Sequence, residues 1–164
     1  MESEQCYDVY MNLRGEIHYG FGGNLCKALR DKGFKTMMSD ERMQSGTQDS
    51  PFLLRAIEQS RIAIVVFSKD YPRYTWCLEE LVKIVECMET KNQLVFPIFY
   101  KVKPYYVREQ KKYYCDAFAK HDKKFGENSE KVQKWRSALS HVAKLHGLIA
   151  RSGYVNFSIL TRIL

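Results

Sequence analysis

Residues 61–67 form an apolar run that is rich in β-branched side chains and contains no charge after Arg61. Such a run is typical of a strand buried on both faces, as strands in parallel sheets are. A second apolar run covers residues 94–100 and includes Pro97, which fits a position where the strand donates no ladder hydrogen bond. Both runs therefore favour a parallel sheet.

Strand-like and helical patterns alternate along the rest of the chain. We expect further strands at 7–13, 34–38 and 147–150. Helical spacing of apolar residues predicts helices at 24–32, 50–57, 76–88, 113–125, 130–145 and 157–164. The polar segment 39–50 is expected to be a loop, and 105–112 to begin with a turn. Strands joined by helices predict an α/β fold with helices on both faces of the sheet.

The composition favours one soluble domain, because 45% of the 164 residues are hydrophobic and 27% are charged. We see neither a membrane-spanning run nor a signal peptide, and we expect a cytoplasmic, or also nuclear, protein without a membrane partner. The five cysteines lack C-x-x-C spacing, so we expect reduced side chains packed as small apolar groups, with no metal and no cofactor.

Trp76 and Glu80 are the first candidates for a functional site. They lie four residues apart and therefore share one face of the predicted helix, apart from the apolar stripe that contains Leu78 and Leu81. Parallel sheets bind ligands outside the carboxyl ends of their strands, and the loop after the first strand contains Arg14. We therefore expect these three side chains to meet at one edge of the sheet, where an aromatic plate and a carboxylate could hold a cationic ring.

Other α/β functions find little support. Residues 20–25 have the position of a dinucleotide-binding loop, but Leu25 stands where the third glycine belongs. The glycines there are equally typical of a tight connection from strand to helix. The acidic residues of a phospho-acceptor site are missing, because Asn12 follows the first strand and Ser68 follows the third. No P-loop or metalloprotease motif occurs.

Several separate blocks, in the right order, resemble plant Toll/interleukin-1 receptor (TIR) domains. The blocks are residues 7–16, 56–68, 76–87, 95–104, 107–110 and 135–139. The resemblance implies a flavodoxin-like fold with a five-stranded parallel sheet in the order 2-1-3-4-5. It also implies a single TIR domain at residues 5–164 after a short tail at residues 1–4.

Plant members of this family cleave NAD+ and NADP+ at the nicotinamide–ribose bond when they self-associate, and they signal in innate immunity. The resemblance implies that Glu80 is the catalytic residue and that Arg14, Gly15 and Trp76 bind the substrate. It also implies that a loop containing Ser39, Asp40 and Gly46 completes the pocket. The implied partners are NAD+ or NADP+ as substrate, further copies of the domain, and other TIR proteins.

The chemistry of these side chains agrees with that activity. Breaking the nicotinamide–ribose bond gives the sugar oxocarbenium character, which a nearby carboxylate stabilises. We expect Glu80 to stay ionised, since the dipole of the helix favours negative charge near its N-terminus. Arg14 could pair with a phosphate of the substrate. The nicotinamide ring is already cationic in NAD+ and leaves as a neutral molecule, so it needs no proton from an acid and one carboxylate suffices where glycosidases use two.

Several positions differ from the family pattern. Residues 16–19 lack an acid and a base of the family's first loop, and Ser39 stands in place of the first of two aspartates. Lys101 and Lys103 replace two acids, and the Ser-His pair used in self-association corresponds to Gly23 and Asn24. We expect these changes to affect assembly and loop geometry more than Glu80.

Two alternatives stay open. The domain could be a non-catalytic module that binds other TIR domains through the same helices. It could also bind nucleic acid, because most of the net charge of +7 lies between Lys101 and Lys134. Tyrosines lie near those lysines, although a solvated helical surface with tyrosines at its rim is the more usual reading. Salt dependence of binding would reveal a nucleic-acid role.

Overall fold

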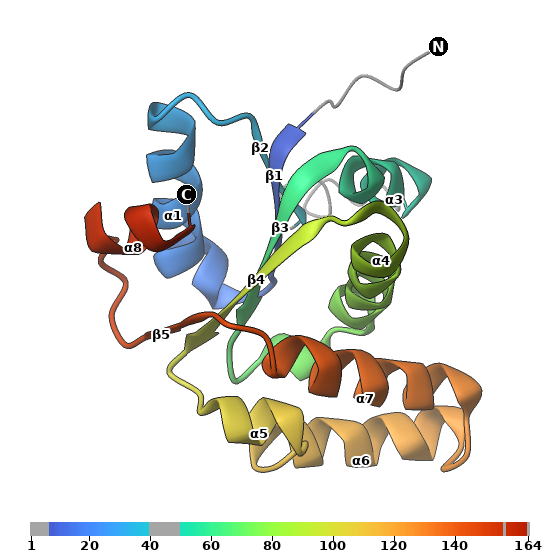
Figure 1. The fold of residues 1–164 in the computed structure, drawn as a ribbon. Helices are drawn as coiled ribbons and strands as arrows, with labels where there is room; N and C mark the ends of the chain where they lie inside the picture. Colours follow the sequence, from blue (N-terminus) through green and yellow to red (C-terminus); the bar gives the residue numbers. More distant parts are fainter. Residues whose placement is uncertain (1–6, 40–49, 156, 164) are drawn as a thin grey trace.

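The protein is described by a computed structural model that covers residues 7–39, 50–155 and 157–163. Five strands form one parallel sheet in the order β2-β1-β3-β4-β5 (Figure 1). The strands are β1 (Tyr7–Asn12), β2 (Thr36–Met38), β3 (Ser60–Phe67), β4 (Leu94–Tyr100) and β5 (Leu148–Ala150). The predicted fold and strand order are therefore confirmed. The expected tail at residues 1–4 lies outside the described residues.

The two long apolar runs occupy the positions expected of them. β3 pairs with β1 on one side and β4 on the other, and its residues from Ala63 to Phe67 are buried. β4 pairs with β5 only from Ile98 onward, so Pro97 has a strand neighbour on one side. A Cβ on Gly147 would lie 2.1 Å from the carbonyl oxygen of Pro97. The backbone at residue 147 therefore lies so close to that of Pro97 that only glycine fits.

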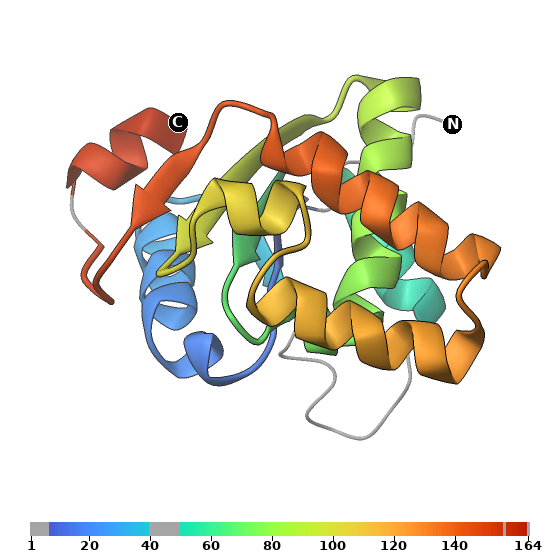
Figure 2. The ribbon, with the colours of Figure 1, turned by 90° about the horizontal axis from the view of Figure 1, so that it is seen from below.

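Helices cover both faces of the sheet, as Figures 1 and 2 show. On one face lie α1 (Phe21–Asp31) and α8 (Phe157–Ile163), and their apolar side chains form one core cluster with that face. A second cluster joins the opposite face to the other helices. These are α3 (Ser50–Glu58), α4 (Thr75–Lys91), α5 (Pro104–Arg108), α6 (Tyr113–Phe125) and α7 (Glu130–Ala143).

Short elements are where the structure departs from the expected pattern. Two 3₁₀ turns, η1 (Glu16–Tyr19) and η2 (Tyr71–Arg73), and the helix α5 were not predicted as elements. They are too short to show helical periodicity, although prolines stand in the first turns of η2 and α5. α1 begins at Phe21, three residues before its expected start, because the chain turns through η1 directly into the helix.

The paired glycines at the start of α1 have a packing reason. A Cβ on Gly23 would lie 2.4 Å from the carbonyl oxygen of His18 in η1. A Cβ on Gly22 would lie 2.5 Å from a methyl carbon of Leu13. The glycines therefore permit η1 to pack closely on α1, which is the structural alternative to a dinucleotide-binding loop.

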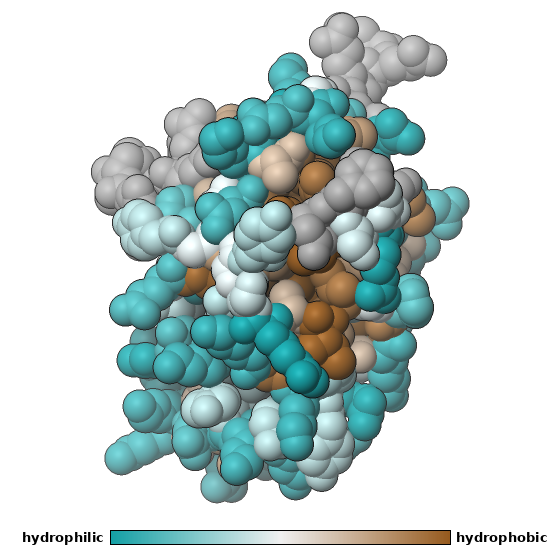
Figure 3. Space-filling view, turned by 90° about the vertical axis from the view of Figure 1, so that its left-hand side faces the viewer, coloured by the Kyte–Doolittle hydropathy of each residue, from teal (hydrophilic) through white to brown (hydrophobic). Residues whose placement is uncertain are grey.

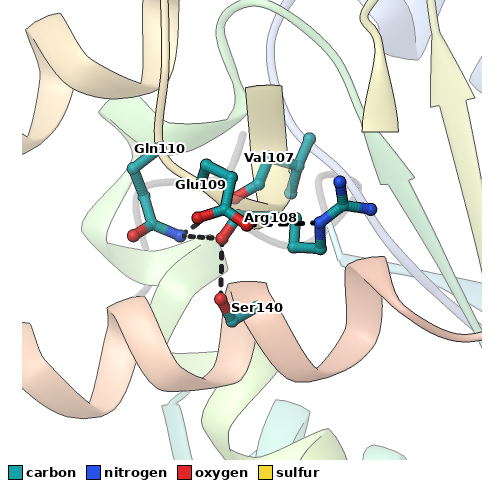
Figure 4. A network of polar contacts seen from close by, with 5 residues as sticks. All are labelled: Val107, Arg108, Glu109, Gln110 and Ser140. Atoms are coloured by element: carbon teal, nitrogen blue, oxygen red, sulfur yellow. Dashed lines mark hydrogen bonds and ion pairs between the residues drawn. The ribbon is translucent and has the colours of Figure 1, made fainter. Parts of the chain in front are cut away.

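Polar contacts at the end of α5 attach it to α7 (Figure 4). The Ser140 hydroxyl of α7 donates to the carbonyl oxygen of Arg108 at 2.6 Å. The Gln110 amide donates to the same oxygen at 3.1 Å and to the Val107 carbonyl at 2.9 Å. Within the described part of the chain, no helix is both long enough and apolar enough to cross a membrane.

Candidate functional site

Glu80 lies in the interior of the protein, on the buried side of α4. Its relative exposure is 0%. The buried stripe of α4 consists of Cys77, Leu78, Glu80, Leu81, Ile84 and Cys87. The expected separation of Glu80 from the apolar stripe is therefore wrong. The helix is rotated so that Val82 and Val85 are only partly buried, and Glu80 takes a core position beside the sheet.

Two side chains of β1 hold one oxygen of Glu80. The Tyr10 hydroxyl donates to Oε1 at 2.9 Å, and the Asn12 amide donates to the same atom at 3.1 Å. The Tyr71 hydroxyl, from η2, donates to Oδ1 of Asn12. The contacts thus join strand β1, turn η2 and helix α4 in one buried network.

Burial raises the pKa of Glu80 to about 7. The hydrogen bonds from Asn12 and Tyr10, the charge of Arg14 and the nearby Trp76 act in the opposite direction. At neutral pH Glu80 is therefore only about half ionised, and not fully ionised as the helix dipole led us to expect. Glu80 is the sixth residue of α4, where the dipole is already weak, and loss of hydration dominates.

The second oxygen of Glu80 has a different environment. Among the described residues, Oε2 and the indole Nε1 of Trp76 are buried atoms without a partner in hydrogen-bonding geometry. The Trp76 indole is nevertheless close enough to lower the pKa of the Glu80 carboxyl as a nearby donor does, although its N–H and Oε2 do not meet in the geometry of a hydrogen bond. Trp76 and Glu79 also line a hollow of about 560 Å³ between α3, α4, α6 and α7, which Glu80 does not line.

Arg14 reaches the start of α4 from the loop after β1. Its guanidinium carbon lies 6.0 Å from the centroid of the Tyr74 ring, which directly precedes α4. Gly15 has a φ of 95°, and a Cβ there would meet the Tyr74 hydroxyl at 3.2 Å. Arg14, Trp76 and Glu80 therefore gather at one edge of the sheet, and Tyr74 packs between the loop and the helix.

Ser39 has a clear structural task. Its hydroxyl donates to the carbonyl oxygen of Leu13 at 2.9 Å and accepts from the Leu13 amide at 3.3 Å. These bonds attach the end of β2 to the end of β1. Asp40 and Gly46, the other expected loop residues of the pocket, lie outside the described residues.

Residues 6–164 match the family model described as TIR domain. The chain belongs to the TIR domain family. It is 44% identical over 146 residues to TMV resistance protein N of Nicotiana glutinosa, covering 88% of this chain and 13% of that protein. It is 42% identical over 153 residues to disease resistance protein RUN1 of Vitis rotundifolia, covering 90% of this chain and 11% of that protein. The chain thus spans only a small part of these relatives.

A solved structure agrees with these similarities. The TIR domains of the activated Roq1 resistosome, which directly recognises the pathogen effector XopQ, superpose with a TM-score of 0.79. They are 44% identical in sequence, and the match covers 87% of each chain. The resemblance to plant TIR domains drawn from the sequence blocks is confirmed.

Sequence reasoning missed Tyr10, Asn12 and Tyr71 in this TIR domain. A signal was present, because Tyr10 and Asn12 are two residues apart and so point to the same face of their strand. Polar groups at two such positions of a central strand need partners when buried. In residues 7–39, 50–155 and 157–163, no group of three or more His, Cys, Asp or Glu side chains is placed to hold a metal ion.

Proposed function

We propose that this TIR domain hydrolyses the nicotinamide–ribose bond of NAD+, and of NADP+, and that self-association activates it in plant innate immunity. The observation that carries the proposal is the Glu80 carboxyl. It is held through Oε1, while Oε2 has no described partner and lies beside Trp76. Arg14 is near enough to lower the pKa of that carboxyl. No metal or cofactor takes part, and the proposed setting is the cytoplasm, with the nucleus as a second compartment.

In this proposal the ionised form of Glu80 faces the ribose as nicotinamide leaves. A carboxylate in a water-poor site stabilises the developing positive charge more strongly than one in water. Trp76 supplies a flat surface for the nicotinamide ring, and Arg14 pairs with a phosphate. Water then adds to the sugar carbon, so that the products are nicotinamide and an ADP-ribose.

Activation by self-association is proposed because Glu80 is closed to solvent, with a relative exposure of 0%. Substrate can reach it only after a rearrangement, and contact between copies of the domain is a source of free energy for that change. The Roq1 TIR domains belong to an activated assembly. In this chain, the side that carries α1 and α8 shows a band of apolar residues among polar ones (Figure 3).

The immune role is proposed from the relatives that this chain is similar to. Two of them are described as resistance proteins, TMV resistance protein N and RUN1. Because the chain spans 13% and 11% of these proteins, we propose the immune role for this domain alone.

The test is turnover of NAD+ by the purified domain over a range of protein concentrations, with nicotinamide quantified by chromatography. We expect activity to rise more steeply than protein concentration and to disappear in Glu80→Ala. Glu79→Ala is the matched control, since Glu79 is an adjacent acid that pairs with Lys131 at 3.6 Å. Nicotinamide release that survives in Glu80→Ala, or no release at any concentration, contradicts the proposal.

The complete burial of Glu80 also favours a second candidate function, a non-catalytic module for TIR–TIR association. In that case the acid serves only to connect α4 to β1 by hydrogen bonds. Sedimentation of the same samples separates the two functions, because the module predicts association without nicotinamide release in every variant.

A further inference from the structure

Glu80 makes unequal use of its two oxygens. Oε1 accepts both hydrogen bonds from β1, whereas Oε2 has no partner in hydrogen-bonding geometry among the described residues. When the acid is neutral, its proton therefore belongs on Oε2, because Oε1 already receives two donors. The surrounding side chains therefore make Oε1 a hydrogen-bond acceptor and leave Oε2 as the oxygen that binds the proton.

The donors themselves are fixed in their roles. Burial raises the pKa of Tyr10 well above its usual value of 10.0, so its hydroxyl stays protonated and donates to Glu80. Burial also raises the pKa of Tyr71 well above 10.0. The Tyr71 hydroxyl donates to Oδ1 of Asn12, which directs the amide nitrogen of Asn12 toward Glu80. A rotated Asn12 amide would lose both bonds.

We infer that Tyr10, Asn12 and Tyr71 are positioning residues that hold Glu80 through Oε1 and reserve Oε2 for the substrate. This inference deepens the proposed hydrolase function and rests on it, because Oε2 faces a substrate only if the domain is a hydrolase. The hydrogen-bond relay itself depends only on the contacts within this chain. It assigns a role to three side chains that come from two separate elements, β1 and η2.

Groups from several elements surround Glu80 and influence its pKa. The groups that influence it are Tyr10 and Asn12 from β1, Arg14 from the following loop, and Trp76 from α4. Cys77 of α4 and Tyr71 of η2 belong to the same cluster, since each interacts with a member of it. Of these contacts, the Tyr10 hydroxyl is the donor that a single substitution removes with the least change in shape.

The decisive measurement is the titration of Glu80 by NMR in protein labelled with ¹³C at glutamate side chains. Glu80→Gln identifies the signal. In Tyr10→Phe we expect the midpoint to move upward by about one pH unit, because a hydrogen bond that stabilises the ionised form is lost. Tyr114→Phe is the matched control, as its buried hydroxyl donates to the Ser68 carbonyl instead. We expect no change there.

Tyr71→Phe is a second variant, in which Glu80 keeps both direct donors but Asn12 loses its orienting partner. We expect a smaller upward movement of the midpoint. An unchanged or lower midpoint in Tyr10→Phe and Tyr71→Phe, with circular dichroism showing both folded, overturns the relay. Because this measurement needs no turnover, it stands even where the wild-type protein fails to cleave NAD+, which would count against the proposed function alone.

Where the wild-type protein is active, the pH profile adds a second readout. Tyr10→Phe should lose activity at pH 7, where fewer molecules have ionised Glu80, and recover at pH 9, where Glu80 is ionised in both proteins. A purely structural role for Tyr10 predicts an equal loss of activity at both pH values. A gain of activity in Tyr10→Phe would mean that Tyr10 keeps Glu80 from the substrate. Either result contradicts the inference.

Discussion

The two faces of the sheet are packed with different chemistry, and β1 contributes to both. Toward α1 and α8 it presents Val9 and Met11, in a cluster made mostly of aliphatic side chains. Toward α4 it presents Tyr10 and Asn12, which bond to Glu80. The core of the first face is thus a cluster of apolar side chains, whereas the core of the other also contains hydrogen-bonded side chains.

This difference shows how a small domain can bury a titratable group in its core. On the α4 face, buried hydroxyls have partners: that of Tyr10 bonds Glu80 and that of Tyr114 bonds the Ser68 carbonyl. These bonds offset part of the cost of burying polar atoms, and they fix side chains in single orientations. The apolar face supplies stability that does not depend on pH.

The largest effect should come from the apolar face. Leu25 of α1 is fully buried in the aliphatic cluster. Leu25→Ala should lower the free energy of unfolding by about 2–5 kcal/mol, because it removes apolar contacts and leaves a cavity. Urea denaturation measures this loss, and NMR should find the Glu80 midpoint unchanged. Ile84→Ala is the control on the other face, one helical turn from Glu80, and should both destabilise and move the midpoint.

A smaller effect, specific to the α4 face, is a dependence of stability on pH. The pKa of Glu80 is about 7 in the folded protein, whereas the usual pKa of a glutamate, as in an unfolded chain, is 4.5. The folded state therefore binds more protons between these values. Stability is full below pH 4.5 and falls by about 3 kcal/mol as pH rises through 7.

Glu80→Gln removes this titration. The difference in unfolding free energy between wild-type protein and Glu80→Gln should therefore change across pH 4.5–7, with the variant gaining relative stability as pH rises. Glu79→Gln should show no such trend relative to wild-type protein. Parallel curves for wild-type protein and Glu80→Gln would mean that Glu80 is already ionised in the folded state.

The secondary-structure elements and the buried polar contacts differ in how well the sequence predicted them. β4 and α6 have the expected bounds, at Leu94–Tyr100 and Tyr113–Phe125, because long apolar or periodic segments determine their own structure. The burial of Glu80 was not predicted, since it depends on how α4 is rotated against β1. Its partners lie 70 and 68 residues away along the chain, and no local sequence pattern predicts a contact between residues so far apart in the sequence.

The smallest effect should come from the outer surface of the apolar face. The Asn24 amide of α1 donates to the carbonyl oxygen of Gly153 at 2.7 Å, where the contact is open to solvent. Water can replace this bond, so Asn24→Ala should cost only about 0.5 kcal/mol in urea denaturation. Hydrogen exchange should show faster opening around Gly153 and unchanged protection in β1. A loss as large as that of Leu25→Ala would show that this face, too, relies on polar contacts.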